Sequence, residues 1–387
     1  MPRIKLGQFL RQSTDVVKID HPEQEKYITV LLYGRGVTER TIKEGKTPVA
    51  FTGYRAHCNQ LIVSTINARH GAIGVVPCQL DGAVVSKDFP LFDIDRSKVD
   101  HNYLLYALWH DSFVRQADAL SFGATMPRLH AKPFLNMDIE LPSLDQQKLI
   151  ANQIQSVESL VASREKQLAK LDELIKSRFI ELFGDPELNP NGWKTTTIGA
   201  VIQSCEAGWS GNGTQREKKP GEIAVLKVSA VTKGFFVPEE CKVLDNQNEI
   251  KKYVFPQKGD LLFSRANTRE MVGATAVIFQ DYPELILPDK LWKIRFYSRA
   301  NVLYMKHILS HKSIRSKFSE ASTGTSGSMF NVSMEKFKAI EIPLPPIERQ
   351  EQFAAFVEQT DKSKLAIQES LAELETLKKA LMQKYFG

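Results

Sequence analysis

One 44-residue stretch occurs twice in this chain, and this repeat limits the folds that the chain can adopt. Residues 141–184 align with residues 344–387 without a gap when 203 is added to each number. The identical pairs are spread along the stretch and include Leu141/Leu344, Pro142/Pro345, Gln147/Gln350, Ala151/Ala354, Leu168/Leu371, Leu171/Leu374, Leu174/Leu377, Lys176/Lys379 and the final Phe-Gly, Phe183/Phe386 and Gly184/Gly387. A repeat of this length indicates that one structural unit is built twice.

Each copy predicts a long helix. An acidic residue, Asp145 or Glu348, follows a Pro-containing segment, and about ten turns then pass without Gly or Pro. A four-three step from Ile150 or Phe353 meets apolar or aromatic residues at eight of ten positions in the first copy and seven of ten in the second. This pattern favours pairing of the two helices over two ordinary amphipathic core helices. The predicted seam contains Ile154, Val157, Val161, Leu168, Leu171, Ile175, Val357, Ile367, Leu371, Leu374 and Leu381.

The length of 387 residues predicts two or three domains. Apolar residues make up 42% of the chain and charged residues 25%, as in ordinary globular proteins. The N-terminus has no apolar run, and no 18-residue window is apolar enough to span a membrane. We therefore expect no secretory signal, no membrane partner and a cytoplasmic location.

The four cysteines, Cys58, Cys78, Cys205 and Cys241, show no CxxC spacing. The lack of this spacing argues against a disulfide framework and against a structural zinc site. His57, Cys58, His70 and Cys78 together could be considered as metal ligands, but the adjacent His57 and Cys58 are an awkward pair for one tetrahedral ion. The sequence therefore predicts no metal site.

Positive charge is concentrated outside the repeated helices. Residues 1–140 have 17 Lys and Arg against 15 Asp and Glu, and residues 191–343 have 22 against 15. The helical segments are slightly acidic, with 6 against 8 in residues 144–187 and 6 against 7 in residues 344–387. This distribution favours a polyanionic partner for the basic segments, and a protein partner or self-pairing for the helices.

The two basic segments predict similar β-rich domains. Residues 61–69 and 261–269 resemble each other at an offset of 200, and short β-branched runs separated by turn residues fill both segments. The sequence therefore predicts an α+β fold with an internal pseudo-twofold repeat, in which two long antiparallel helices accompany two β-rich domains. We place the boundaries at 1–143 for the first domain, 144–184 for the central helix, 185–192 for a linker, 193–343 for the second domain and 344–387 for the last helix.

The usual catalytic motifs are missing. Residues 45–47 resemble the end of a phosphate-binding loop, but position 40 is Arg where that loop needs Gly. Residues 344–346 lack the Asn or Asp that precedes Pro-Pro in the loops by which amino-methyltransferases hold an extruded base. No catalytic residue is predicted.

The loops of both domains contain side chains that suit base edges and phosphates, since Arg pairs with guanine, Asn and Gln pair with adenine, and Lys binds phosphate. The candidate DNA-binding residues are Arg35, Lys43, Lys46, Arg55, Asn67, Arg69, His70, Lys87, Asn212, Gln215, Arg216, Lys218, Lys219, Lys233, Arg265, Asn267, Arg269 and Lys290. We expect about a third of them to contact DNA. Asn67 and Asn267, which recur together with Ser64 and Ser264, could instead be structural turn residues.

A further pattern lies in residues 342–350 at the start of the last helix, in their degraded copy at 141–147, and in residues 182–185 at the end of the central helix. In these three segments the chain resembles the specificity subunits of Type I restriction-modification systems. The tandem arrangement covers the whole chain. Ser143, which stands where the pattern has a second Pro, should alter the start of the central helix slightly.

The resemblance implies two target recognition domains that read the two halves of a split, asymmetric site in double-stranded DNA, with the two helices as a spacer. It also implies two methyltransferase subunits and restriction/translocase subunits as partners, and these would hold S-adenosylmethionine, ATP and Mg while this chain is non-catalytic and holds no cofactor. A coiled-coil scaffold or adaptor that binds proteins through its sheet domains is the alternative.

Overall fold

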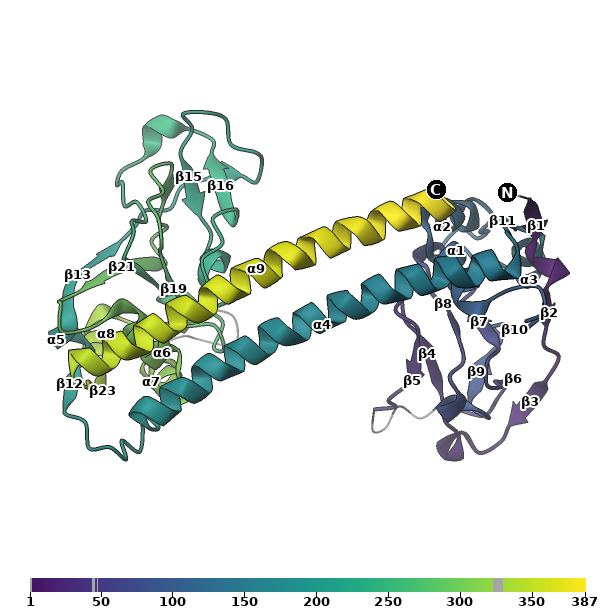
Figure 1. The fold of residues 1–387 in the computed structure, drawn as a ribbon, viewed down its shortest axis with the longest axis horizontal. Helices are drawn as coiled ribbons and strands as arrows, with labels where there is room; N and C mark the ends of the chain where they lie inside the picture. The colour runs from purple at the N-terminus through teal and green to yellow at the C-terminus, as the bar shows by residue number, and fades with distance from the viewer. Residues whose placement is uncertain (1, 44–45, 47, 323–329) are drawn as a thin grey trace. The chain divides into compact units, whose positions relative to one another are not determined.

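The computed structural model describes residues 2–43, 46, 48–322 and 330–387, and it divides into two compact units. The first unit contains residues 1–165 and 369–387, and the second contains residues 166–368. The two long helices, α4 (Leu144–Phe183) and α9 (Ile347–Phe386), each contribute one part to each unit. The elements of each unit can be followed in Figure 1.

The first unit is built around a four-stranded antiparallel sheet with the order β2 (Leu10–Gln12), β10 (Leu91–Ile94), β7 (Leu61–Val63) and β8 (Ile73–Val75). Smaller antiparallel sheets surround it, namely β1 (Arg3–Lys5) with β11 (Asp138–Glu140), β4 (Ile28–Val30) with β5 (Val37–Glu39), and β3 (Val16–Ile19) with β6 (Phe51–Arg55) and β9 (Val84–Ser86). The three residues of β7 are all buried, as expected for the centre of a sheet covered on both faces.

Three short helices complete the first unit: α1 (His101–Trp109), α2 (Asp111–Ala119) and α3 (Ala131–Asn136). The sequence predicts one helical piece over residues 102–119, but the helix breaks at His110. The imidazole Nδ1 of His110 accepts the backbone N–H of Ser112 at 3.3 Å and so caps α2. A capping side chain with extended backbone separates two helices that their apolar pattern alone would join.

The second unit repeats this plan. Its central sheet has the order β13 (Ile202–Ala207), β21 (Leu291–Phe296), β17 (Leu261–Ser264) and β19 (Thr275–Val277), and its helices are α5 (Ile198–Val201), α6 (Val302–Ser310), α7 (Lys312–Ala321) and α8 (Met334–Ala339). The other strands are β12 (Thr195–Thr197) with β23 (Glu341–Pro343), β18 (Ala266–Asn267) with β22 (Phe330–Asn331), and β14 (Gly213–Thr214), β16 (Cys241–Leu244), β15 (Ala224–Leu226) and β20 (Leu285–Ile286). His311 separates α6 from α7 as His110 separates α1 from α2. The predicted α+β class with an internal repeat is confirmed.

One glutamine in each copy of the repeat fastens a long helix to its domain. The amide Oε1 of Gln147 accepts the N–H of Asp100 at 2.8 Å, and its Nε2 donates to the carbonyls of Lys98 and Pro142 at 3.1 and 2.8 Å. Gln350 makes the same three bonds, to the N–H of Asn301 at 2.9 Å and to the carbonyls of Arg299 and Pro345 at 3.2 and 2.7 Å. Both side chains are completely buried. The repeated glutamine is therefore a structural residue.

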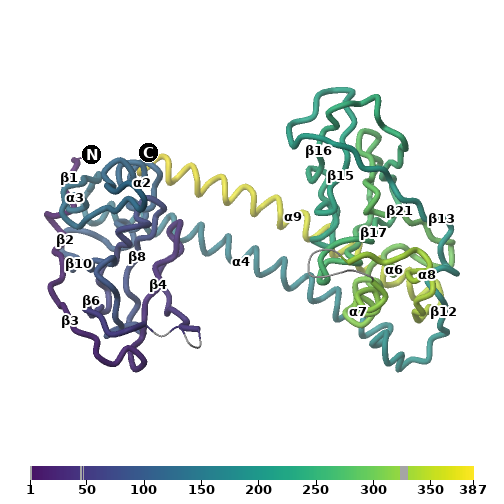
Figure 2. Tube along the Cα trace, turned by 180° about the vertical axis from the view of Figure 1, so that it is seen from behind, coloured from purple at the N-terminus to yellow at the C-terminus, as the bar shows by residue number. Residues whose placement is uncertain are grey.

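Each unit packs the beginning of one long helix beside the end of the other, and the pairing is antiparallel in both. In the first unit Lys378 Nζ contacts Glu158 Oε1 at 2.7 Å, and the Tyr385 hydroxyl donates to Gln153 Oε1 at 3.0 Å. In the second unit Lys364 Nζ contacts Asp172 Oδ1 at 2.7 Å. Within each unit, residue numbers that increase along α4 lie beside residue numbers that decrease along α9. Figure 2 shows both traces from the opposite side.

The predicted seam residues are all buried or half-buried, whereas leucines outside the four-three frame are exposed. Ile154, Val157, Ile175 and Val357 are buried, and the remaining seven are half-buried. Leu160, Leu174, Leu365 and Leu377 are 50%, 48%, 57% and 46% exposed. The frame therefore distinguishes the covered face of each helix from the solvent face.

Gly184 ends α4. Its φ of 76° is left-handed, and a Cβ at this position would lie 2.4 Å from the ring of Pro190. The chain then turns through residues 185–192, where Asp185 Oδ1 accepts the N–H of Glu187 at 2.8 Å.

A disulfide joins Cys58 to Cys78, whose Cα atoms are 4.5 Å apart. The prediction that the cysteines form no disulfide is therefore wrong for this pair, while Cys205 and Cys241 are free. The two residues are adjacent because the N–H of Asn59 bonds the carbonyl of Val76 at 2.8 Å. A spacing of 20 residues gives no sign of that contact. Within the part of the chain that the structure describes, no helix combines the length and the apolar composition needed to cross a membrane.

Candidate nucleic-acid interface

In the first unit, three loops meet at one end of the central sheet. The N–H of Thr65 donates to the carbonyl of Asp88 at 2.8 Å, and the N–H of Leu129 donates to the carbonyl of Thr65 at 2.8 Å. Arg128 Nε reaches Asp88 Oδ1 at 3.2 Å. The loops that meet are those after β7, between β9 and β10, and between α2 and α3. They bring together the candidates Asn67, Arg69, His70 and Lys87.

The turn between β4 and β5 joins the same surface. The N–H of Tyr33 donates to the carbonyl of His70 at 2.8 Å, and the N–H of Gly34 donates to that of Gly71 at 3.1 Å. Tyr33 has a φ of 59° and its side chain is 73% exposed, and Arg35 is exposed beside it. An exposed aromatic ring held by a fixed turn next to basic groups suits apolar contact with a thymine methyl group in a DNA groove.

The second unit forms the equivalent surface with different side chains. The N–H of Arg265 donates to the carbonyl of Lys290 at 3.1 Å, and the N–H of Val332 donates to the carbonyl of Arg265 at 2.9 Å. Asn267 pairs with Phe330 in the β18–β22 ladder. The guanidinium carbon of Arg269 lies 5.9 Å from the centre of the Phe330 ring, which orients this exposed side chain. Asn267, Arg269 and Lys290 are thus brought together.

Several candidates are already paired with acidic groups. Arg55 makes two bonds to the Glu25 carboxylate, at 2.9 and 3.2 Å, and Arg216 makes two to Glu222, both at 2.8 Å. Lys218 contacts Glu284 at 3.2 Å, Arg265 lies 3.8 Å from Asp289, and Arg69 lies 3.7 Å from Asp118. Hydrogen bonding to Arg216 lowers the pKa of the Glu222 carboxyl to about 2, so this pair stays ionised at neutral pH. These five cationic side chains are therefore less available to bind DNA phosphates than unpaired ones.

Other candidates present exposed cationic or polar groups. They are Arg35, Lys43, Lys46, His70, Lys87, Asn212, Gln215, Lys219, Lys233 and Arg269, and Lys290 and Asn67 are half-buried. Gln215 accepts a bond from Lys227 at 3.1 Å. Lys43 and Lys46 border residues 44, 45 and 47, which lie outside the described residues. Residues 45 and 47 belong to the rejected phosphate-loop match. Lys233 does not join the Arg265 surface and lines a separate cleft.

Sequence reasoning missed four residues of the first surface: Tyr33, Phe122, Met126 and Arg128. Phe122 and Met126 are 67% and 49% exposed on the loop after α2, and Phe122 and Arg128 form a backbone bridge that closes this loop. The Tyr-Gly-Arg-Gly run at residues 33–36 was a usable signal, because a short turn rich in Gly places an aromatic and a basic side chain at its tip.

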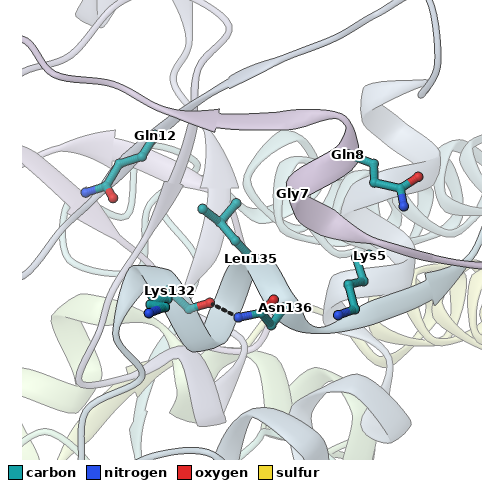
Figure 3. A pocket seen from close by; sticks show the side chains of 7 residues that line it. All are labelled: Lys5, Gly7, Gln8, Gln12, Lys132, Leu135 and Asn136. Carbon is teal, nitrogen blue, oxygen red and sulfur yellow. Dashed lines mark hydrogen bonds between the residues drawn. The ribbon is translucent and has the colours of Figure 1, made fainter.

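A hollow of about 430 Å³ lies elsewhere in the first unit. Figure 3 shows Lys5 and Lys132 at its edge with Gln8, Gln12 and Asn136 around Leu135. Asn136 Nδ2 donates to the carbonyl of Lys132 at 3.1 Å. None of the predicted DNA-binding residues lines this hollow. In the described ranges, no three His, Cys, Asp or Glu side chains are grouped to hold a metal ion.

Residues 24–173 and 190–377 match the model of the Type I restriction modification DNA specificity domain family. The chain belongs to this family. It is 29% identical over 194 residues to the Type I restriction enzyme EcoEI specificity subunit of Escherichia coli, a match that covers 48% of this chain and 32% of that protein. It is 24% identical over 291 residues to the EcoKI specificity subunit of Escherichia coli K12, covering 69% of this chain and 61% of that protein.

The matches thus span about one third and three fifths of the length of these two relatives. Solved structures share the fold of this specificity-domain chain along its whole length. A chain from a type I R-M system, solved to study complex assembly and conformational transition, has a TM-score of 0.57 at 19% identity and is covered to 97%. The S subunit of a Type-I restriction-modification system from M. genitalium has a TM-score of 0.58 at 13% identity and is covered to 96%. Membership of a DNA specificity family favours DNA recognition over the scaffold alternative.

Proposed function

We propose that this chain is the DNA-recognition subunit of a Type I restriction-modification complex and that its two units read two different half-sites in double-stranded DNA. The observation that carries the proposal is one loop scaffold built twice with different side chains. At an offset of 200, Asn67 and Arg69 correspond to Asn267 and Arg269, whereas Thr65 corresponds to Arg265 and His70 to Glu270. Because base readout depends on these donors and acceptors, different loops imply an asymmetric site.

The chemistry of such a complex would belong to other subunits. Methyltransferase subunits would supply S-adenosylmethionine and transfer its methyl group to adenine, and restriction subunits would supply the ATP- and Mg-dependent reactions. This chain would contribute basic loops for salt-dependent affinity and a few Arg, Asn and aromatic contacts for sequence choice. Its exposed α4 and α9 faces would offer the docking surface, in a cytoplasmic complex.

The decisive experiment is methylated-motif sequencing of cells that express this chain together with its methyltransferase. We expect a split, asymmetric adenine-methylated motif that is absent when the methyltransferase is expressed alone. The same motif without this chain, or no motif with it, would count against the proposal and in favour of the scaffold alternative.

The two exposed arginines Arg269 and Arg216 should behave differently. Arg269→Ala should weaken binding to the identified duplex by about 1–3 kcal/mol, because its guanidinium is oriented over Phe330 and has no carboxylate partner among the described residues. Arg216→Ala is the matched control and should change affinity less than about threefold, since Glu222 already neutralises that side chain. Fluorescence anisotropy of the assembled complex at several salt concentrations measures both, and equal losses would contradict the assignment.

A further inference from the structure

A cleft of about 850 Å³ opens in the second unit, and none of Arg265, Asn267, Arg269 and Lys290 lines it. Its walls come from α4, α6, α9, β19, the beginning of α7 and the turn after Val231. Phe235, Phe279 and Ile180 are 55%, 60% and 42% exposed in this lining. A cavity of this size with apolar walls and a few polar groups is typical of small-molecule sites.

His307 lines this cleft and has one unpaired ring nitrogen buried in the wall. Its Nε2 is shielded from solvent and has no hydrogen-bond partner in the described part of the chain. The ring packs perpendicular to Phe353 with centroids 5.1 Å apart. Burial lowers the imidazole pKa well below its usual value, and the charges of Lys306, Lys364 and Lys176 lower it further. A neutral imidazole nitrogen without a partner is costly in a folded protein.

The cleft is strongly cationic. Lys364 is held between Asp172 at 2.7 Å and Asp361 at 3.2 Å, and these are the acidic residues of the lining. The lysines and arginine of the lining outnumber them by four and are Lys176, Lys233, Lys306, Lys312, Arg315 and Lys364. Three of them, Lys176, Lys233 and Lys312, are exposed at the surface. Excess positive charge beside apolar walls favours an anion that also has a flat or apolar part.

The first unit shows the same position filled. Tyr106 stands where the second unit has His307, and its hydroxyl donates to Glu158 at 2.6 Å. Trp109 stands in place of Ser310, and its indole N–H donates to the carbonyl of Ile73 at 2.8 Å. The two rings are in edge contact at 6.0 Å.

The turn above this position differs in the same way. A Cβ at Gly34 would lie 2.7 Å from the Trp109 ring, whereas one at Gly234 would meet no atom within 4 Å. Smaller residues and an open turn therefore leave space in the second unit that the first unit fills with its own aromatic side chains.

We propose that this cleft binds a nucleotide, with the heteroaromatic ring against the exposed phenylalanines and the phosphates among the lysines. The rings of Phe235 and Phe279 can cover a planar base, and the excess positive charge of the lining matches two to four phosphate charges. This departs from the expectation that the chain holds no small molecule. It does not rest on the proposed function, because the cleft contains none of the Arg265 surface.

Calorimetric titration of the full-length chain with ATP, adenosine and tripolyphosphate, without DNA, tests the proposal. ATP should bind with a Kd in the micromolar range, and adenosine and tripolyphosphate should each bind about tenfold or more weakly, because each lacks one part of the ligand. No binding of ATP, or equal binding of tripolyphosphate, would overturn the proposal. Loss of ATP binding in the presence of a saturating DNA duplex would show that the cleft holds DNA phosphates instead.

Two variants locate the site. Ser310→Trp copies Trp109 and should reduce ATP affinity about tenfold or more by filling the cleft. Lys233→Ala, at the exposed rim, should reduce it about three- to tenfold and does not depend on repacking. Lys251→Ala removes an exposed lysine of the same unit outside the cleft and should leave affinity unchanged. Binding that is insensitive to both Ser310→Trp and Lys233→Ala would place ATP elsewhere and overturn the assignment.

Discussion

Replacing Gln350 by alanine should lower the free energy of unfolding of the second unit by about 3–5 kcal/mol, because three backbone groups lose the buried side chain that satisfies them all at once. The N–H of Asn301 and the carbonyls of Arg299 and Pro345 each bond this amide. Denaturation in urea, with hydrogen exchange to identify the unit that opens, measures the change.

Gln352→Ala is the matched control for this prediction. Gln352 is an exposed amide on the same helix, bonded to Arg349 at 3.2 Å, and its loss should cost less than about 0.5 kcal/mol. Gln147→Ala should destabilise the first unit by a similar amount to Gln350→Ala, since the three bonds are repeated there. A loss below about 1 kcal/mol at both glutamines would show that water substitutes for the amide.

Asp260→Ala should be comparably damaging to the second unit. This carboxylate is completely buried, and it accepts Arg295 Nε at 2.6 Å and the backbone N–H of Gln257 at 2.7 Å, with Lys293 Nζ at 3.3 Å. Its removal leaves the nearly buried Lys293 ammonium without a carboxylate, and breaking a buried pair in this way costs about 3–5 kcal/mol.

The conservative variant Asp260→Asn keeps the shape of the side chain and one acceptor oxygen, so it should lower the free energy of unfolding less than Asp260→Ala does. Asp281→Ala is a control, because Asp281 is exposed and accepts only the N–H of Lys258 in the described part of the chain, at 2.8 Å. Thermal and urea unfolding of the three variants measure the order of their stabilities. Equal stability of Asp260→Ala and the unchanged protein would mean that Lys293 finds full compensation from Phe255 and Gln257.

The repeat made the long helices predictable, because spacing along a helix fixes which side chains share a face. The same local rule could not foresee the breaks at His110 and His311, where a capping imidazole competes with the helix. Gln147 and Gln350 were visible as identical positions, but their bonds reach segments about fifty residues away in sequence. Local pattern predicts elements, and distant contacts decide what a side chain does.

The candidate interface was harder to predict for the same reason. Arg55 has the right chemistry for DNA, yet Glu25, thirty residues earlier, occupies its guanidinium. Cys58 and Cys78 are joined through strand ends whose proximity the sequence does not reveal. Conversely, Tyr33 reaches the surface because a turn bonds to His70 across the fold. A list of basic residues therefore overestimates the cations that are available to DNA.

The division of α9 between the units has a consequence for synthesis of the chain on the ribosome. The first unit needs residues 369–387, where Leu381 and Phe386 pack against its core and the carbonyl of Phe386 accepts the Ser112 hydroxyl at 2.9 Å. About two hundred residues separate these from Glu165. At roughly 5–20 residues per second, that interval lasts roughly 10–40 s. Residues 1–165 are therefore synthesised before the second unit, yet their own unit is completed only after residues 369–387 have been made, and its apolar surface stays uncovered during that interval.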